Sequence, residues 1–352
     1  MSNNHGHRSL YGPLLALMAV ACGVASCSAP IDLSAVSSYA NTTAQSATAF
    51  SAVAQDFEGS CERFSSVILG LVQPEVAAQQ APVVVSSAPP KEAFLLPSNM
   101  TPAPGYTAPP EAYYAEGAGS APRPLQFDPQ CADARTVSAA WDHANTVVLN
   151  YVQALGNLAK VDAVPSPNPS PLVAGLAKAG VSSGATQALS GLVTAISGFF
   201  VNKTRNSDIK KFLEDVNPHM PGTVAALEVT DASYTIELDA EFTKVRAQYA
   251  DYVIGEIAAR DALPGNDRNG RAAVNRRLAI TKGAVLAALA SINQHLRSSQ
   301  DYGNAISGIL KTHQALYKEA EARASFANYL NIIKTTGQPV LSDLQDLMKA
   351  VK

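Results

Sequence analysis

Apolar and small residues recur at alternating steps of three and four along most of this chain of 352 residues. No sustained alternation of apolar and polar residues, as in a half-buried β-strand, accompanies them. The longest stripe lies within residues 33–72 and consists of Leu33, Val36, Ala40, Thr43, Ala47, Phe50, Ala54, Phe57, Cys61, Phe64, Ile68 and Leu71. Such spacing fills one face of an α-helix, because one turn takes about 3.6 residues. The pattern predicts an all-α chain whose first helix is long.

Further stripes predict the later helices. One covers residues 132–160, an apolar region of low charge covers 172–201, and a short amphipathic helix is expected at 210–216. One further stripe follows Pro221, and others cover 274–296, 306–333 and 341–351. Breaks between helices are expected at 263–270, at 301–303, and at Gly337 and Pro339. We therefore expect an elongated bundle of five to seven helices.

Residues 73–130 interrupt this pattern, since they hold 12 of the 22 prolines of the chain. Proline lacks a backbone donor and fixes φ, so neither helix nor sheet propagates through such a stretch. We expect a long disordered insertion. The predicted organisation is a targeting segment at 1–26, a first long helix within 27–72, the insertion at 73–130 and the remaining bundle at 131–352.

The N-terminus reads as an export signal. A polar segment whose only full charge is Arg8 precedes the apolar run Leu14–Ala25. This run is shorter than the ~20 apolar residues that a transmembrane helix needs, and it matches the length of a signal peptide's apolar core. It ends in Val24-Ala25-Ser26-Cys27.

These four residues resemble the lipobox of bacterial lipoproteins. The resemblance implies cleavage before Cys27 and a diacylglycerol on its sulfur, which would anchor the protein to a membrane. Ser28 and Ala29 stand where the inner-membrane retention signal of many such lipoproteins has Asp. The resemblance thus favours the outer membrane, with the body facing the periplasm. Processing at Ala19-Val20-Ala21-Cys22, or plain secretion after an A-x-A-like site, stays an alternative.

Cleavage before Cys27 leaves 326 residues with 25 Lys and Arg against 29 Asp and Glu, a net charge of −4. This balance excludes a general nucleic-acid binder. The other cysteines of the mature chain, Cys61 and Cys131, predict one disulfide in an oxidising compartment. Cys61 lies 28 residues after Leu33, and Ala159 lies 28 after Cys131. The bridge would therefore align two antiparallel helices end to end; two unpaired thiols are the alternative.

Motifs for chemistry are weak. Gly180-Val-Ser-Ser-Gly184 matches the G-x-S-x-G pattern of serine hydrolases, but no strand precedes it, so Ser182 fits a loop or helix start better. The chain has neither H-E-x-x-H nor E-x-x-H, and His313 falls on an apolar stripe, where a structural role is usual. We therefore expect no enzyme activity, no metal and no cofactor.

The candidate binding residues are Arg268, Arg271, Arg276 and Arg277, at a turn and the start of a helix. Cations there oppose the helix dipole. They could face an anionic partner, such as lipid headgroups, an acidic glycan or a protein. Alternatively, they could pair with Glu256, Asp261 and Asp267.

The leading functional hypothesis is a membrane-anchored scaffold or adaptor that binds another envelope component. The rival hypothesis is a membrane-active protein that inserts residues 172–201, as helical pore-forming toxins insert an apolar segment. Gly184, Gly191 and Gly198 recur in that segment and predict close helix approach. An envelope hydrolase is a third, weaker class.

Overall fold

The computed structural model describes residues 34–72, 91–98, 100–104, 131–157, 172–201, 207–322 and 326–351. All of them belong to one compact unit, residues 34–352. The predicted signal segment and Cys27 lie outside the described residues.

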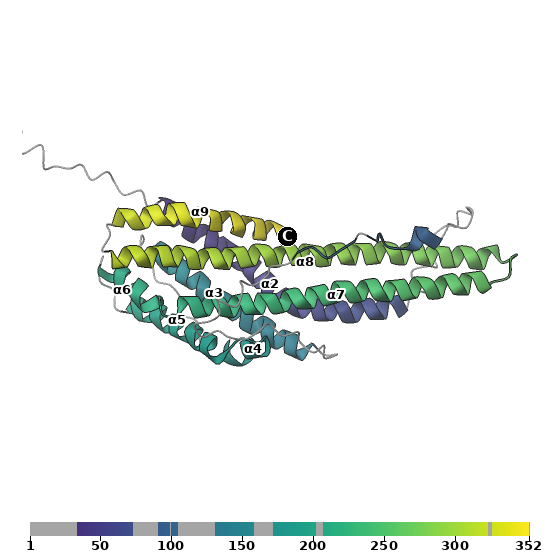
Figure 1. The fold of residues 1–352 in the computed structure, drawn as a ribbon, viewed down its shortest axis with the longest axis horizontal. Helices are drawn as coiled ribbons and strands as arrows, with labels where there is room; N and C mark the ends of the chain where they lie inside the picture. Colours follow the sequence, from purple (N-terminus) through teal and green to yellow (C-terminus); the bar gives the residue numbers. More distant parts are fainter. Residues whose placement is uncertain are drawn as a thin grey trace, which may run out of the picture. The chain divides into compact units, whose positions relative to one another are not determined.

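The all-α prediction is confirmed (Figure 1). The described residues contain no strand and form eight α-helices, one more than the upper end of the expected range, and one short 3₁₀ helix. In chain order they are α2 (Ser34–Val72), η2 (Lys91–Phe94), α3 (Ala132–Asn157), α4 (Leu172–Lys178), α5 (Ser183–Val201), α6 (Ser207–Val216), α7 (Met220–Ala262), α8 (Arg268–Glu321) and α9 (Phe326–Ala350).

The additional helix comes from a break in the apolar region 172–201. Gly180 has φ 93° and closes α4, a backbone conformation that costs glycine little. The Val181 amide donates to the Leu176 carbonyl (3.1 Å) and the Gly180 amide to that of Ala177 (3.2 Å). Both apolar side chains, Leu176 and Val181, are buried. These two bonds and the apolar pair form a Schellman C-cap.

Two predicted breaks are wrong. Helix α8 continues through residues 301–303, because Tyr302 is fully buried there and one glycine costs a helix only about 1 kcal/mol. Helix α9 continues through Gly337 and Pro339. A Cβ at Gly337 would lie 3.1 Å from the ring of Tyr39 in α2, so this glycine gives room for a neighbouring helix instead of ending its own.

The core lies where α2, α3, α7 and α8 meet. Trp141 of α3 is fully buried, and its ring centroid lies 6.2 Å from Phe57, 5.6 Å from Tyr234 and 5.1 Å from Tyr302. These three rings come from α2, α7 and α8 respectively. Edge-to-face packing of this kind adds about 0.5–1.5 kcal/mol per pair to the gain from burial.

Helices α7 and α8 form the longest antiparallel pair and meet at the turn that follows Ala262 (Figure 1). Asp267 caps α8, since its carboxylate accepts a bond of 2.8 Å from the Gly270 amide. We call the end of this pair around that turn the hairpin tip, residues 261–277.

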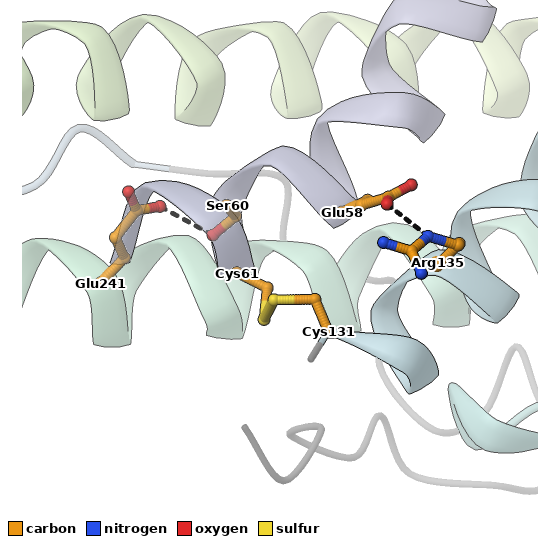
Figure 2. The surroundings of a disulfide bond; sticks show 6 residues. All are labelled: Glu58, Ser60, Cys61, Cys131, Arg135 and Glu241. Atoms are coloured by element: carbon orange, nitrogen blue, oxygen red, sulfur yellow. Dashed lines mark hydrogen bonds and ion pairs between the residues drawn. A yellow bond between two sulfur atoms is a disulfide. The ribbon is translucent and has the colours of Figure 1, made fainter. Parts of the chain in front are cut away.

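The predicted disulfide is present in the structure and joins α2 to the residue before α3 (Figure 2). The Cα atoms of Cys61 and Cys131 lie 5.9 Å apart. Arg135 pairs with Glu58 (2.6 Å) beside the bridge, and Asn145 reaches the Phe50 carbonyl (3.2 Å) farther along. Because rising numbers in α3 meet falling numbers in α2, the helices are antiparallel, as expected. The ends of the predicted register, Leu33 and Ala159, lie outside the described residues.

Part of the Pro-rich segment packs on the bundle, unlike the unpacked segment expected for 73–130. Residues 91–98 and 100–104, which we call the strap, run along α8 (Figure 1). Phe94 is 4% exposed, so the strap has an apolar anchor. The rest of the insertion lies outside the described residues.

The disulfide yields the first prediction. Its cysteines are 70 residues apart, and the chain-entropy model then gives about 4 kcal/mol of stabilisation. We expect a Cys61→Ser/Cys131→Ser variant to lose about that much free energy of unfolding in urea titrations. As the control, reductant should destabilise the parent protein and leave the variant unchanged. Equal stability of the two proteins under oxidising conditions would contradict this role.

Candidate functional site

The four predicted arginines all lie at the hairpin tip, at the start of α8. Arg268 is exposed, whereas Arg271, Arg276 and Arg277 are half-buried. Arg277 pairs with Glu256 of α7 (2.7 Å), and this bond is the largest cause of its raised pKa. Arg271 donates to the Leu263 carbonyl (2.9 Å). At least two of the four are therefore bonded to other residues of the α7–α8 hairpin.

Of the acidic residues predicted as alternative partners of these arginines, one forms such an ion pair. Glu256 pairs with Arg277 as the alternative expected, but Asp261 pairs with Arg260 (2.9 Å) and Asp267 caps α8. The cap supplies the negative group that the N-terminus of α8 favours. The structure thus brings the four arginines to one end of the hairpin.

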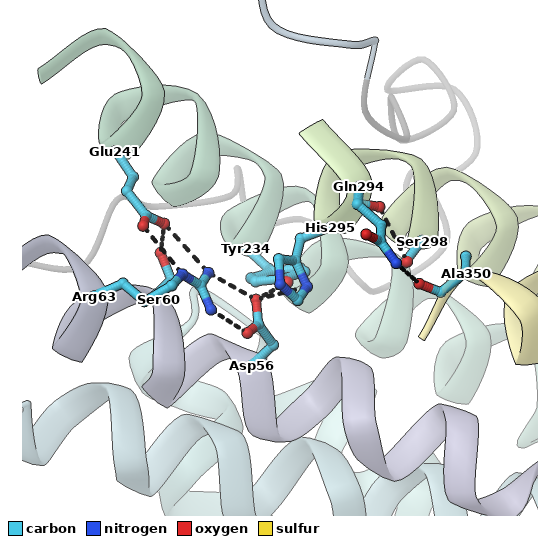
Figure 3. Close-up of polar contacts among 9 residues, drawn as sticks. All are labelled: Asp56, Ser60, Arg63, Tyr234, Glu241, Gln294, His295, Ser298 and Ala350. Atoms are coloured by element: carbon cyan, nitrogen blue, oxygen red, sulfur yellow. Dashed lines mark hydrogen bonds and ion pairs between the residues drawn. The ribbon is translucent and has the colours of Figure 1, made fainter. Parts of the chain in front are cut away.

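A half-buried ionic network that the sequence did not predict joins α2, α7 and α8 (Figure 3). We call it the ionic junction; it consists of Asp56, Ser60, Arg63, Tyr234, Glu241 and His295. Arg63 bridges both carboxylates, with its Nη2 3.0 Å from Asp56 Oδ2 and its Nε 3.2 Å from Glu241 Oε1.

The remaining members saturate the two carboxylates. Ser60 donates to Glu241 (2.7 Å), the Tyr234 hydroxyl donates to Asp56, and His295 Nδ1 lies 3.2 Å from Asp56. Each carboxylate therefore has several donors, which is the condition under which buried charges are tolerated.

Burial sets the direction of the pKa shift at two members of this junction, whereas the two carboxylates outweigh it at Arg63 and raise the pKa of the guanidinium. Burial raises the pKa of Glu241, although the Arg63 charge and the Ser60 hydroxyl oppose that shift. It lowers the pKa of His295, so His295 is neutral at pH 7. One guanidinium thus faces two carboxyl groups, and the contacts of these groups connect α2, α7 and α8.

The sequence held a weak signal for this junction. Asp56 and Arg63 are seven residues apart and so share one face of α2, at the edge of its apolar stripe. Their partners on α7 and α8 lie far away in sequence, so no local pattern could have named Glu241 or His295.

His313 and Ser182 make the structural contacts that the sequence analysis favoured for them. His313 is fully buried, and its Nδ1 lies 2.7 Å from the Tyr151 hydroxyl. Burial lowers its pKa to about 4, so the ring is neutral at pH 7. Ser182 precedes α5, and its Oγ accepts from the Ala185 amide (3.2 Å), as expected of a helix start. No group of His, Cys, Asp and Glu able to hold a metal ion occurs among the described residues.

One face of the apolar region 172–201 packs in the bundle. Leu189, Leu192 and Ile196 of α5 are at most 1% exposed, and α5 contacts α3, α6 and α7. Helix α5 comes close to the start of α7, since a Cβ at Gly222 would lie 2.7 Å from that of Ala188. Among the described residues, no helix is long and apolar enough to cross a membrane.

The predicted role of the α5 glycines holds at one position. A Cβ at Gly191 would lie 2.3 Å from the His219 ring, so space is tight there. Gly198 has nothing within 4 Å of such a Cβ, and Gly184 is exposed. The side chains of Phe199 and Phe200, which would distinguish core from membrane-inserting helix, lie outside the described part of the chain.

The strap is held by four side chains of α7 and α8, which we call the strap seat. Tyr249 donates to the Phe94 carbonyl (2.8 Å), Lys282 to that of Ala93 (2.8 Å), and Arg246 to that of Met100 (2.6 Å). Asn293 Oδ1 accepts from the Ala103 amide (2.6 Å). All four bonds go to main-chain atoms, so the seat binds the backbone of the strap, whose first four residues form the 3₁₀ helix η2. The apolar run Phe94-Leu95-Leu96 was the sequence signal for an ordered strap.

No known family model, curated protein or solved structure matches this chain.

A buried carboxyl pair on α7 gives a pH prediction. Asp231 is fully buried; its Oδ1 accepts from Ser299 (2.9 Å) and its Oδ2 has no partner. Burial first, and then the Glu228 charge, raise the pKa of Asp231 well above its usual value. The folded protein thus holds this proton more tightly than the unfolded chain, so stability is lost as pH rises through the folded-state pKa.

We expect Asp231→Asn to remove this loss, because an amide stays neutral at every pH. The variant should unfold at a higher temperature than the parent at pH 8, and the difference should shrink as pH falls toward 4. Thermal unfolding followed by circular dichroism measures this. Asp239→Asn, an exposed position on the same helix, is the matched control and should change little. A variant less stable than the parent at pH 8 would show that Asp231 is stabilised as a carboxylate.

Proposed function

We propose that this chain is a lipid-anchored lipoprotein of the bacterial cell envelope, facing the periplasm, whose helical unit is a scaffold or adaptor for another envelope component. The observation that carries the proposal is the Cys61–Cys131 disulfide in a chain that begins with an export signal and a lipobox-like VASC. Disulfides of this kind belong to oxidising compartments outside the cytoplasm.

The helical unit suits a scaffold for a physical reason. Its buried polar groups, including the ionic junction, bond to one another across helices. They consequently fix the arrangement of the helices. The long hairpin α7–α8 carries the two candidate binding surfaces, which are the four arginines of the hairpin tip and the strap seat.

The buried side chains of α5 favour this proposal over the membrane-active alternative. Inserting α5 into a bilayer would require pulling Leu189, Leu192 and Ile196 out of the bundle. In the bundle, the burial of one such side chain contributes about 1.5–3 kcal/mol to stability. The bilayer would have to replace this contribution for each of the three. Insertion would also strip α7 of its packing against α5.

The anchor is tested by mass spectrometry of the mature N-terminus. We expect a peptide that begins at Cys27 and carries a diacylglycerol on its sulfur. Cys27→Ser should abolish the modification and shift the protein from the detergent phase to the aqueous phase. The matched control is Cys22→Ser, which should be processed as the parent is. A lipidated peptide beginning at Cys22, or an unmodified N-terminus elsewhere, would contradict this proposal.

Whether the arginines of the hairpin tip bind an anionic surface is tested with anionic vesicles. Each basic residue near an anionic surface contributes about 1 kcal/mol, so Arg268→Gln/Arg276→Gln should weaken binding roughly thirtyfold. The difference should shrink as salt rises, because exposed charges are screened over ~10 Å at 0.1 M. The charge-matched control is Lys311→Gln/Lys334→Gln, away from the tip. Equal binding of the two variants would remove the tip as an anionic-partner surface.

A further inference from the structure

The strap contributes little of its own side-chain chemistry to its contact with the hairpin. Among its described residues only Phe94 is buried, whereas Leu95 is 40% exposed and most of the others are exposed or half-buried. Its hydrogen bonds to α7 and α8 use the main-chain atoms of Ala93, Phe94, Met100 and Ala103. Every peptide carries such main-chain atoms, so another segment that follows the same backbone path as the strap could make the same four bonds.

The direction of the strap is fixed by the positions of these bonds. From Ala93 to Ala103, the strap advances along α8 from Lys282 to Asn293. Over the same stretch it moves back along α7, from Tyr249 to Arg246. The strap therefore lies parallel to α8 and antiparallel to α7, with the Phe94 side chain as its apolar anchor.

The charges of the seat are not matched by the strap. Arg246 and Lys282 both donate to neutral carbonyl oxygens, and neither has a carboxylate within ion-pair distance among the described residues. Both bonds already have a charged donor, and a carboxylate acceptor would add the attraction between opposite charges. A peptide that placed carboxylates at these two points would therefore bind the seat better than the resident strap does.

We propose that the strap seat is a binding surface for an acidic peptide with an aromatic anchor, supplied by a partner protein, and that the strap occupies this surface in cis. The partner displaces the strap, puts its aromatic side chain in the place of Phe94, and pairs its carboxylates with Arg246 and Lys282. This proposal deepens the adaptor function and rests on it, because it gives the adaptor a surface and a partner chemistry.

The probes are two fluorescent peptides with the sequence of residues 91–104. One carries Glu in place of Ala93 and Met100, and the other carries Gln at both positions. Binding is measured by fluorescence anisotropy to the mature full-length protein in detergent. A Phe94→Ser variant of the protein weakens the cis contact and so vacates the seat.

We expect the Glu peptide to bind the Phe94→Ser protein at least tenfold more tightly than the parent protein. We expect it to bind that variant at least fivefold more tightly than the Gln peptide does. Adding Arg246→Gln and Lys282→Gln should remove the preference for the Glu peptide. Arg268→Gln, which removes one positive charge from the same hairpin outside the seat, should retain it.

Limited proteolysis of the parent protein gives a second readout that does not depend on the Phe94→Ser variant folding. The Glu peptide should accelerate cleavage within residues 94–100, because displacement of the strap exposes its backbone. Unchanged cleavage at saturating peptide would overturn the proposal. So would an absence of binding by a Phe94→Ser protein with the parent's helical circular dichroism, or binding that ignores Arg246 and Lys282.

A third outcome would assign the seat to a different occupant. If the Phe94→Ser protein or the parent forms a reversible dimer that the Gln peptide dissolves as well as the Glu peptide, the occupant is the strap of a second copy, and the acidic partner is overturned. Failure of lipidation at Cys27 is read separately by mass spectrometry. The two proposals therefore fail independently in experiment.

Discussion

The contact of Trp141 with three aromatic rings holds the helical unit together. Phe57, Tyr234 and Tyr302 approach the indole from α2, α7 and α8, and Trp141 itself comes from α3. The polar atoms of this cluster are connected by successive hydrogen bonds. The indole N–H donates to the Tyr302 hydroxyl (2.7 Å), which donates to Asn145 (2.6 Å). An aromatic core with its hydrogen bonds satisfied fixes the four helices in one arrangement.

The ionic junction extends this core toward the surface. Tyr234 packs against Trp141 with its ring and donates to Asp56 with its hydroxyl, so one side chain belongs to both clusters. Asp56 in turn contacts Arg63 and His295. Loss of Arg63 would leave two carboxylates without their cation, and this kind of change in a buried pair is strongly destabilising. Hydrophobic packing and charge pairing are therefore coupled through Tyr234.

The sequence predicted what depends on local periodicity and covalent chemistry. The stripe from Leu33 to Leu71 indicated α2, and the equal spacings on either side of Cys61 and Cys131 indicated an antiparallel, disulfide-linked pair. The errors have a common physical cause, because tertiary packing overrode local propensity. Gly337 and Pro339 read as a helix end, but Gly337 makes room for Tyr39 and the helix continues to Ala350. Local signals existed for Asp56, Arg63 and the strap, but their partners could not be predicted, since these lie more than a hundred residues away in sequence.

The length of α8 has a mechanical consequence. With 54 residues, this helix extends about 80 Å at 1.5 Å per residue. From Tyr302, in the aromatic core, to Arg268, at the tip, the distance along it is roughly 50 Å. At this distance a rotation of the hairpin by about 5° would move the tip by roughly 4 Å. The ionic junction and the strap contact α8 between the core and the tip. Whatever occupies the position of the strap therefore adds a third element to this part of the hairpin and would resist such a rotation.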